Sequence, residues 1–354
     1  MVTTTRATSN VPGATGRRYY GDNAYEHFFV WRGTAARQNM PLIVYIKPGH
    51  TFNMGERVMD PHTSASPALG DAIDLIYSTM NWPIVGIEFR PPHSADSPKR
   101  EPFSFRSWPG QIHSIAKFMR YARQHWNDET LWGTGGSIDP GRIMVIGSSS
   151  GHTMGLALAA IPPDAFGSPP LVLGQTEQVG DHRPNVCAGF IGQTDWTQFI
   201  LDSGATSGPF AYDIMQYFHG LNGTLTNTNL PNAVKRSASP YWWLRYLEPG
   251  RTAFWASWGA NGSGQGANLT PADFLPDSPR TATNKRFIDP HHFFQAKPLE
   301  DALKRRGAIN RIIWGDNSNN PLGWNNDNVG LDSTTTSQDL LKFVRNDLGW
   351  PVVS

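Results

Sequence analysis

Short apolar runs separated by polar turns recur along the chain, and they predict buried strands. Residues 41–46 read Pro-Leu-Ile-Val-Tyr-Ile, and residues 82–89 read Trp-Pro-Ile-Val-Gly-Ile-Glu-Phe. Neither run alternates apolar with polar residues, which is typical of strands covered on both faces. Residues 137–141 (Ser-Ile-Asp-Pro-Gly) predict a turn before the next strand. Further strands are predicted over residues 26–31, 142–146, 186–191, 252–258 and 310–314.

Segments with apolar positions three or four residues apart lie between these runs and predict helices. In one of them the apolar face consists of Ile112, Ile115, Phe118, Met119 and Ala122. Residues 154–160 (Met-Gly-Leu-Ala-Leu-Ala-Ala) predict a helix of small residues that packs closely on a sheet and ends before Pro162. Further helices are predicted over residues 213–219, 241–246, 292–306 and 337–348.

Strands and helices therefore alternate, which is the pattern of a mostly parallel sheet with helices on both faces. We expect one α/β domain over residues 19–354. The long polar stretches 196–240 and 259–290 are predicted loop insertions, because long loops of α/β domains lie over the strand ends. Residues 1–18, rich in Thr, Ser and Asn, predict an extended arm that is either mobile or laid on a protein partner.

Composition and charge exclude several classes of function. The formal net charge is +1, so the chain lacks the basic surface that nucleic-acid binding requires. Cys187 is the single cysteine, which excludes a disulfide framework and a cysteine metal site. No stretch approaches the roughly 20 apolar residues of a membrane span. Residues 1–6 lack the apolar core of a secretory signal, so we expect a soluble protein.

Motifs for metals and nucleotides are also missing from the sequence. The 11 histidines include no H-E-x-x-H or His-x-His spacing, and no Walker or dinucleotide loop precedes a helix. The sequence therefore predicts neither a cofactor nor a metal.

One motif does carry chemistry. Residues 147–151 read Gly-Ser-Ser-Ser-Gly and match G-x-S-x-G with Ser149 at the centre, between a predicted strand and a predicted helix. That context is typical of a nucleophile elbow, a tight turn that lifts a serine hydroxyl above the sheet. The start of the following helix offers N–H groups to a developing oxyanion. The alternative interpretation is a plain Gly-Ser turn that opens a helix.

Through this motif the sequence resembles the α/β-hydrolase superfamily, and within it the carboxylesterase/lipase-like branch, over about residues 40–350. Residues 139–151 resemble that branch's approach to the elbow, Asp-Pro-x-Arg-Ile leading to G-x-S-x-G. Residues 85–92 resemble its strand that ends in Tyr-Arg and a proline, and residues 237–241 its Ala-Ser-Pro segment. Residues 298–307 resemble the helix before the last strand. The resemblance implies the α/β-hydrolase fold: a mostly parallel central sheet with helices on both faces and long loops over the strand ends.

The resemblance also implies an oxyanion loop after the third strand of the fold. Where relatives begin with His-Gly-Gly, this chain reads Lys-Pro-Gly-His-Thr-Phe from residue 47. Pro48 has no N–H to donate. The expected donors are therefore Gly49, His50 or Thr51, with Ser150 as the second donor.

Both partners that the resemblance implies for Ser149 are missing from their usual places, which indicates a degenerate or rearranged triad. Asn261 or Gly262 stands where relatives carry the acid. No histidine follows His292, so the base is absent after the last predicted strand. An esterase needs such a base to take the serine proton and an acid to orient it.

Several histidines and carboxylates compete for these roles. His292 is the preferred base, with His291 beside it, and the acids that could orient it are Asp289, Asp273 and Asp277. A solvated histidine pair at a helix start is the alternative interpretation of His291 and His292. Asp195 lies at an acid position used in some relatives, or else caps a turn. His152 begins the elbow helix and is expected to pack or point sideways.

Two functions follow from these residues. The first is an esterase-like serine hydrolase that cleaves a small-molecule or polymer-linked carboxylic ester through Ser149, with His292 as base. The second is a non-catalytic α/β-hydrolase-like binding or structural protein. Such a protein would dock, through the N-terminal arm, on a larger assembly such as a virion or a cell surface.

Overall fold

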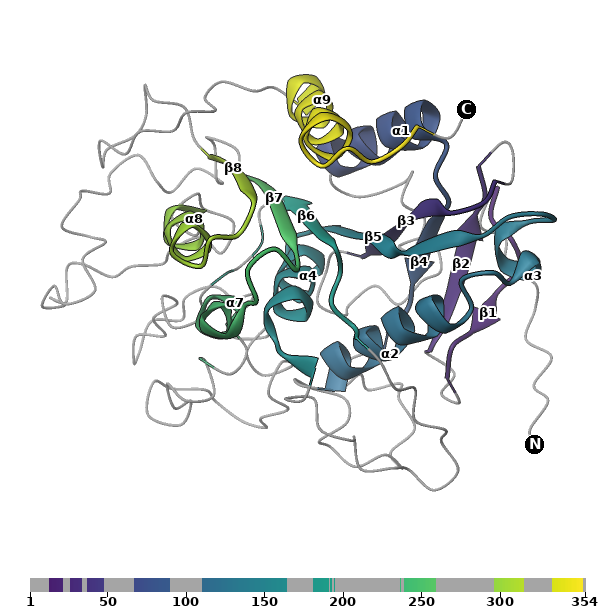
Figure 1. Cartoon of the computed structure of the whole chain (residues 1–354), viewed down its shortest axis with the longest axis horizontal. Coiled ribbons are helices and arrows are strands. Elements are labelled where there is room, and N and C mark those ends of the chain that lie inside the picture. Colours follow the sequence, from purple (N-terminus) through teal and green to yellow (C-terminus); the bar gives the residue numbers. More distant parts are fainter. Residues whose placement is uncertain are drawn as a thin grey trace, which may run out of the picture.

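One eight-stranded sheet runs through the chain in the order β1-β2-β4-β3-β5-β6-β7-β8 (Figure 1). The computed structural model describes residues 13–21, 26–33, 37–47, 67–89, 110–163, 181–190, 192, 194, 236, 239–258, 296–314 and 333–352. Strands β1 and β2 pair antiparallel, and β2 pairs antiparallel with β4. All other neighbouring strands pair parallel, which confirms the predicted sheet. The strands are β1 Arg18–Tyr19, β2 His27–Trp31, β3 Met40–Ile46, β4 Ile84–Ile87, β5 Ile138–Ser148, β6 Val186–Phe190, β7 Ala253–Trp258 and β8 Asn310–Trp314.

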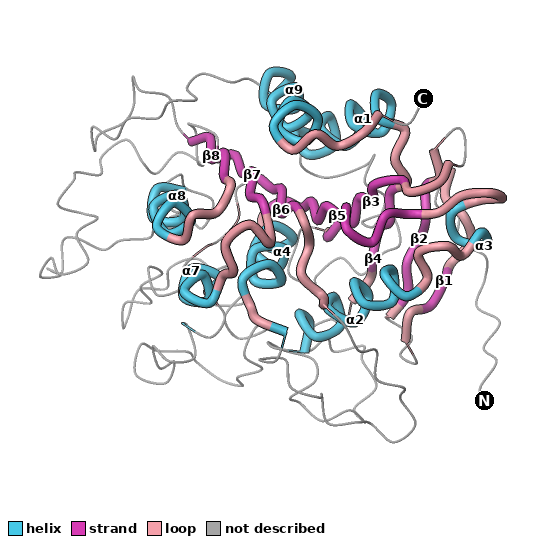
Figure 2. The backbone as a smooth tube through the Cα atoms, viewed as in Figure 1, coloured by secondary structure: helices cyan, strands magenta, loops and turns pink. Residues whose placement is uncertain are grey.

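Helices cover both faces of this sheet (Figure 2). Helices α1 and α9 lie on one face, and α2, α4, α7 and α8 lie on the other (Figure 1). The helices are α1 Pro67–Met80, α2 Gly110–Gln124, α3 Glu129–Trp132, α4 Ser150–Ala160, α7 Pro240–Trp243, α8 Ala296–Arg305 and α9 Ser333–Lys342.

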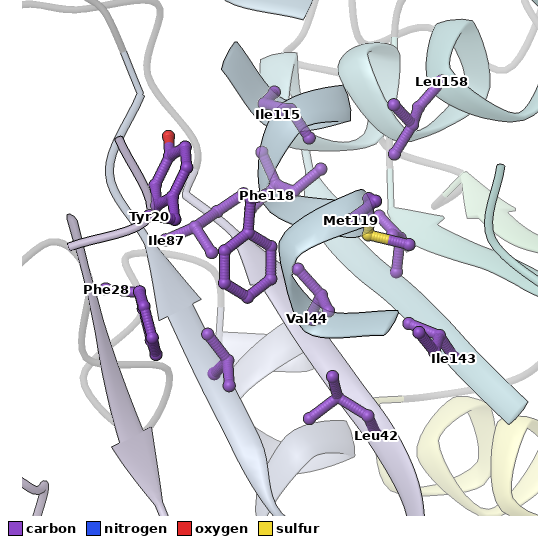
Figure 3. Close-up of a cluster of buried hydrophobic side chains, with 14 of the residues drawn as sticks. Tyr20, Phe28, Leu42, Val44, Ile87, Ile115, Phe118, Met119, Ile143 and Leu158 are labelled. Carbon is purple, nitrogen blue, oxygen red and sulfur yellow. The ribbon is translucent and has the colours of Figure 1, made fainter. Parts of the chain in front are cut away.

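Helices on both faces of the sheet explain why the strands are continuous apolar runs. In β3, Leu42 and Val44 belong to the core beneath α2 and α4, whereas Ile43 and Tyr45 belong to the core beneath α1 and α9. Every residue of the strand is therefore buried, and no polar face is needed. Figure 3 shows the first of these cores, where Phe118 and other side chains of α2 lie over the strands.

Helix boundaries differ from the predicted ones by a few residues. The predicted helix 241–246 is α7 followed by a 3₁₀ turn at Leu244–Tyr246. The predicted helix 337–348 begins earlier, as α9, and continues into a π-helical turn at Phe343–Asp347. Of the predicted helix 292–306, the structure describes α8, and the predicted helix 213–219 lies outside the described residues.

The predicted turn at residues 137–141 is wrong, because Ser137 directly precedes β5 and residues 138–141 belong to that strand. Met40 pairs with Ile138, and Leu42 already pairs with Ile143, so the pairing shifts register between them. The Asp-Pro-Gly segment is accommodated as an irregularity inside the strand, which is where proline is tolerated in a sheet.

Candidate active site

The parallel strands bring their carboxyl ends to one edge of the sheet, which is where α/β proteins bind ligands. Strand β5 ends at Ser148, and Ser149 follows it directly as the residue that precedes α4. Lys47 follows β3, Glu88 follows β4, and Trp258 is the last residue of β7. Residues far apart in the sequence therefore meet around Ser149.

Ser149 has the backbone conformation of a nucleophile elbow. Its φ is 51° and its ψ is −122°, a region that residues with a side chain rarely adopt. Such a conformation costs about 1–3 kcal/mol and persists only where the surrounding structure enforces it. The serine between strand and helix is thus held in a strained turn, as its motif predicts.

Hydrogen bonds on both sides of Ser149 enforce this turn. The Ser149 N–H donates to the Phe190 carbonyl of β6 at 2.9 Å. The Ser149 carbonyl accepts from the Thr153 N–H at 3.0 Å and from the Thr153 hydroxyl at 3.1 Å. These bonds fix the backbone of the turn to β6 and to the first turn of α4.

Gly147 and Gly151 leave the room that the turn needs. A Cβ on Gly147 would lie 2.6 Å from the Gly151 carbonyl carbon, and a Cβ on Gly151 would overlap the Ile46 carbonyl oxygen of β3. Both contacts involve backbone, which cannot move aside. The two glycines of G-x-S-x-G are therefore required by close approach, because strand, turn and helix cross within contact distance.

Ser150 occupies the first position of α4, directly after the elbow. The first N–H groups of a helix have no acceptor within the helix, and the helix dipole favours negative charge at that end. The role of the Ser150 backbone N–H as an oxyanion donor stays a prediction.

A buried ion pair lies beside the elbow, at the ends of β3 and β4. Ile46 pairs with Ile87, so the next residues, Lys47 and Glu88, are neighbours. The Lys47 Nζ lies 2.6 Å from the Glu88 Oε1, and both side chains are 2% exposed. Burial raises the pKa of Glu88, and the Lys47 ammonium opposes that rise.

Several solved structures share this architecture. An esterase B from Lactobacillus rhamnosis matches with a TM-score of 0.56 at 12% identity, covering 94% of this chain and 84% of that one. The thermophilic esterase Est2 of the Planctomycetes species Thermogutta terrifontis matches with a TM-score of 0.54 at 13% identity, covering 98% and 96%. An acetyl ester-xyloside bifunctional hydrolase from Caldicellulosiruptor lactoaceticus matches with a TM-score of 0.55 at 12% identity, covering 97% and 100%.

The chain has the α/β-hydrolase fold. At these identities the likeness shows the fold alone. No protein-family model and no curated protein matches the sequence.

Within this α/β-hydrolase fold, most candidate partners of Ser149 fall outside the described residues. Gly49, His50 and Thr51 are among them, and so are Asp195, Asn261, Gly262, Asp273, Asp277, Asp289, His291 and His292. Each of these stays a prediction.

His152 is the one histidine near the elbow that the structure describes, and it points into the protein. Its side chain is 1% exposed, and its Nδ1 accepts a hydrogen bond from the Gly192 N–H at 3.1 Å. Burial lowers the pKa of the imidazole to about 3. His152 is therefore a buried, neutral residue packed inside the protein.

In the described ranges, no group of three or more His, Cys, Asp or Glu side chains is arranged to hold a metal ion. Of the helices described, none is long and apolar enough to cross a bilayer. Cys187 is buried in β6, and burial raises the pKa of its thiol, which makes it a poor nucleophile.

The Lys47–Glu88 pair is the feature that sequence reasoning missed. A lysine directly after one apolar run and a glutamate inside another, at the carboxyl ends of adjacent strands, was a readable signal. Reading it requires the strand order and register that bring the two side chains together.

Proposed function

We propose that the protein is a serine hydrolase that cleaves a small-molecule or polymer-linked carboxylic ester, with Ser149 as nucleophile. The observation that carries the proposal is the strained backbone of Ser149, enforced by the Phe190 and Thr153 hydrogen bonds and by two glycines without space for a side chain. Strain of this kind costs stability, and presenting a nucleophile at a tight turn would give it a purpose. The names of the structural neighbours make ester cleavage the first activity to test.

The proposed reaction has two acyl-transfer steps. The Ser149 hydroxyl oxygen attacks the ester carbonyl while His292 takes its proton, and the backbone N–H groups of Ser150, Gly49 and His50 hold the oxyanion. The C–O bond to the alcohol then breaks, and the alcohol leaves with that proton. Water repeats the sequence on the acyl-serine, which releases the carboxylic acid and restores Ser149.

Labelling and turnover by point variants test this proposal. The wild-type protein should react with a fluorophosphonate probe and hydrolyse p-nitrophenyl acetate and butyrate. Ser149→Ala should abolish both reactions. His292→Ala should lower kcat by about 10²–10⁴-fold, the usual contribution of a general base. Ser78→Ala is the matched control, because among the described residues the exposed Ser78 hydroxyl bonds only to carbonyls of its own helix α1.

The outcomes separate the two functions. If Ser149→Ala retains labelling, or if the wild type shows neither labelling nor turnover, Ser149 is not the nucleophile. The second result would favour the non-catalytic binding or structural protein, since no histidine follows His292 in the sequence. Full activity in His292→Ala would show that a residue other than His292 acts as the base.

A further inference from the structure

The imidazole of His152 fills the space between the ends of β6 and β7. A Cβ on Gly192 would lie 2.5 Å from its Nδ1, and a Cβ on Gly189 would overlap its ring carbons. The ring also packs against Trp258, at a centroid distance of 5.3 Å and an interplanar angle of 47°. The side chain of the elbow helix thus reaches across to two strands.

The hydrogen bonds of His152 define its tautomer. Because Nδ1 accepts from the Gly192 N–H, the ring proton lies on Nε2. Among the described residues, nothing accepts a hydrogen bond from that buried Nε2. A buried unpaired donor is destabilising, so an apolar side chain of similar size would suit pure packing better. The imidazole therefore serves, through Nδ1, as the hydrogen-bond acceptor of the Gly192 N–H.

Gly192 is held from its other side as well. The Trp258 indole N–H donates to the Gly192 carbonyl at 3.2 Å. Two residues further on, the Thr194 carbonyl accepts from the Tyr241 N–H at 2.9 Å. The segment that follows β6 is therefore tied to α4, to the end of β7 and to α7.

We propose that His152 is a positioning residue: through the Gly192 N–H it holds the segment after β6, and with it the end of β7, in place against the nucleophile elbow. The role rests on the proposed function. The segment after β6 leads in the sequence to Asp195, a candidate acid. The segment after β7 leads to Asn261, which stands at the position predicted for the acid by resemblance. His152 itself touches no reacting atom.

Replacing the acceptor tests this role. His152→Leu removes Nδ1, and His152→Asn returns an oxygen acceptor near the same place. We expect His152→Leu to lower kcat and the rate of fluorophosphonate labelling by up to about 100-fold, because small displacements of catalytic groups cost that much. KM for p-nitrophenyl acetate should change little, and His152→Asn should recover most of kcat.

His182→Leu is the matched control. His182 is also buried, but it precedes β6, at the opposite edge of the sheet, where its Nε2 bonds the Ile161 carbonyl. The His182 variant should lose stability and keep kcat at temperatures where it is folded. Circular dichroism fixes that temperature for every variant.

Three results would overturn the positioning role. They are unchanged kcat in folded His152→Leu, an equal loss of kcat in His182→Leu, and no recovery in His152→Asn. If His152→Leu does not fold, His152→Asn is compared with His152→Gln, whose amide reaches the Nε2 position instead, and equal activities would overturn the role. A wild-type protein without Ser149-dependent labelling would overturn the proposed function itself, and this role with it.

Discussion

Two buried histidines, His152 and His182, mark the two ends of α4. His152 lies in its first turn, and His182 bonds the carbonyl of Ile161, which follows its last residue. Burial lowers the pKa of both imidazoles to about 3, and for His182 the nearby Arg120 contributes in the same direction. Both rings are therefore neutral at neutral pH. The His152 Nδ1 accepts from the Gly192 N–H, which a charged ring could not do, whereas the His182 Nε2 donates to the Ile161 carbonyl.

These low pKa values predict a loss of stability in acid. The ordinary pKa of histidine is 6.5, so between pH 6.5 and pH 3 the unfolded chain binds protons that the folded chain does not. The free energy of unfolding therefore falls as the pH falls through that window, by about 1.4 kcal/mol per pH unit for each histidine. Urea unfolding at several pH values measures the slope.

Variants isolate this contribution from the carboxylates, which also titrate. The raised pKa of Glu88 acts in the opposite direction, since its stabilising effect is present below pH 4.5 and is lost as the pH rises. His182→Asn and His152→Asn each remove one imidazole and leave Glu88 in place, so each should flatten the slope. A slope identical to that of the wild type would show that the imidazole is not held neutral.

At the scale of elements, the buried ion pair joins the ends of β3 and β4 directly before the predicted oxyanion loop. Tyr20 supports the same corner, because its hydroxyl donates to the Glu88 carbonyl at 2.6 Å. The Gly151 backbone of α4 lies against the Ile46 and Lys47 carbonyls. We therefore expect a change in the Lys47–Glu88 pair to affect the backbone that contacts the nucleophile elbow.

Removing one partner of this pair should destabilise the protein strongly. Lys47→Met leaves Glu88 buried without a cation, and we expect a loss of about 3–5 kcal/mol in the free energy of unfolding. The pKa of Glu88 should rise further, so the loss should be greater at pH 8 than at pH 5. Lys47→Met combined with Glu88→Leu should recover most of the loss.

An ion pair on α8 with an exposed lysine serves as the control. Lys304 and Glu300 are four residues apart, and the Lys304 side chain is 56% exposed. Lys304→Met should therefore change the free energy of unfolding by no more than about 0.5 kcal/mol. Equal effects of the Lys47 and Lys304 variants in chemical denaturation would contradict a stabilising role of the buried pair.

Strands and the elbow are predictable from the sequence because their signals are local. The apolar runs that became β3, β6 and β8, and the G-x-S-x-G turn, are read from neighbouring residues. Helix α1 was readable as well, since Leu69, Ile73, Ile76 and Met80 repeat at helical spacing, but it was not predicted. The irregular start of β5 and the Lys47–Glu88 pair depend on register between strands, which no local pattern contains.

At the scale of the whole molecule, the last described residues return to the middle of the sheet. Strand β8 lies at the edge far from β1, yet α9 packs beside α1 on the same face (Figure 1). Beyond α9, the Trp350 ring lies 5.6 Å from the Trp82 ring, and the Trp82 indole N–H donates to the Pro351 carbonyl at 2.9 Å. We expect contacts between residues so distant in the sequence to couple unfolding of the C-terminal segment to unfolding of the sheet.

Substitution of Trp350 tests whether the C-terminal segment unfolds together with the sheet. It is 8% exposed, and Trp350→Ala would leave a cavity beside Trp82 at the start of β4. We expect a loss of about 3–5 kcal/mol in the free energy of unfolding. Circular dichroism and tryptophan fluorescence should report the same urea midpoint, because the α1–α9 face and the elbow belong to one sheet. Trp126→Ala, at a side chain 38% exposed, should cost far less. Separate midpoints for the two signals would mean that the C-terminal segment unfolds independently of the Ser149 site.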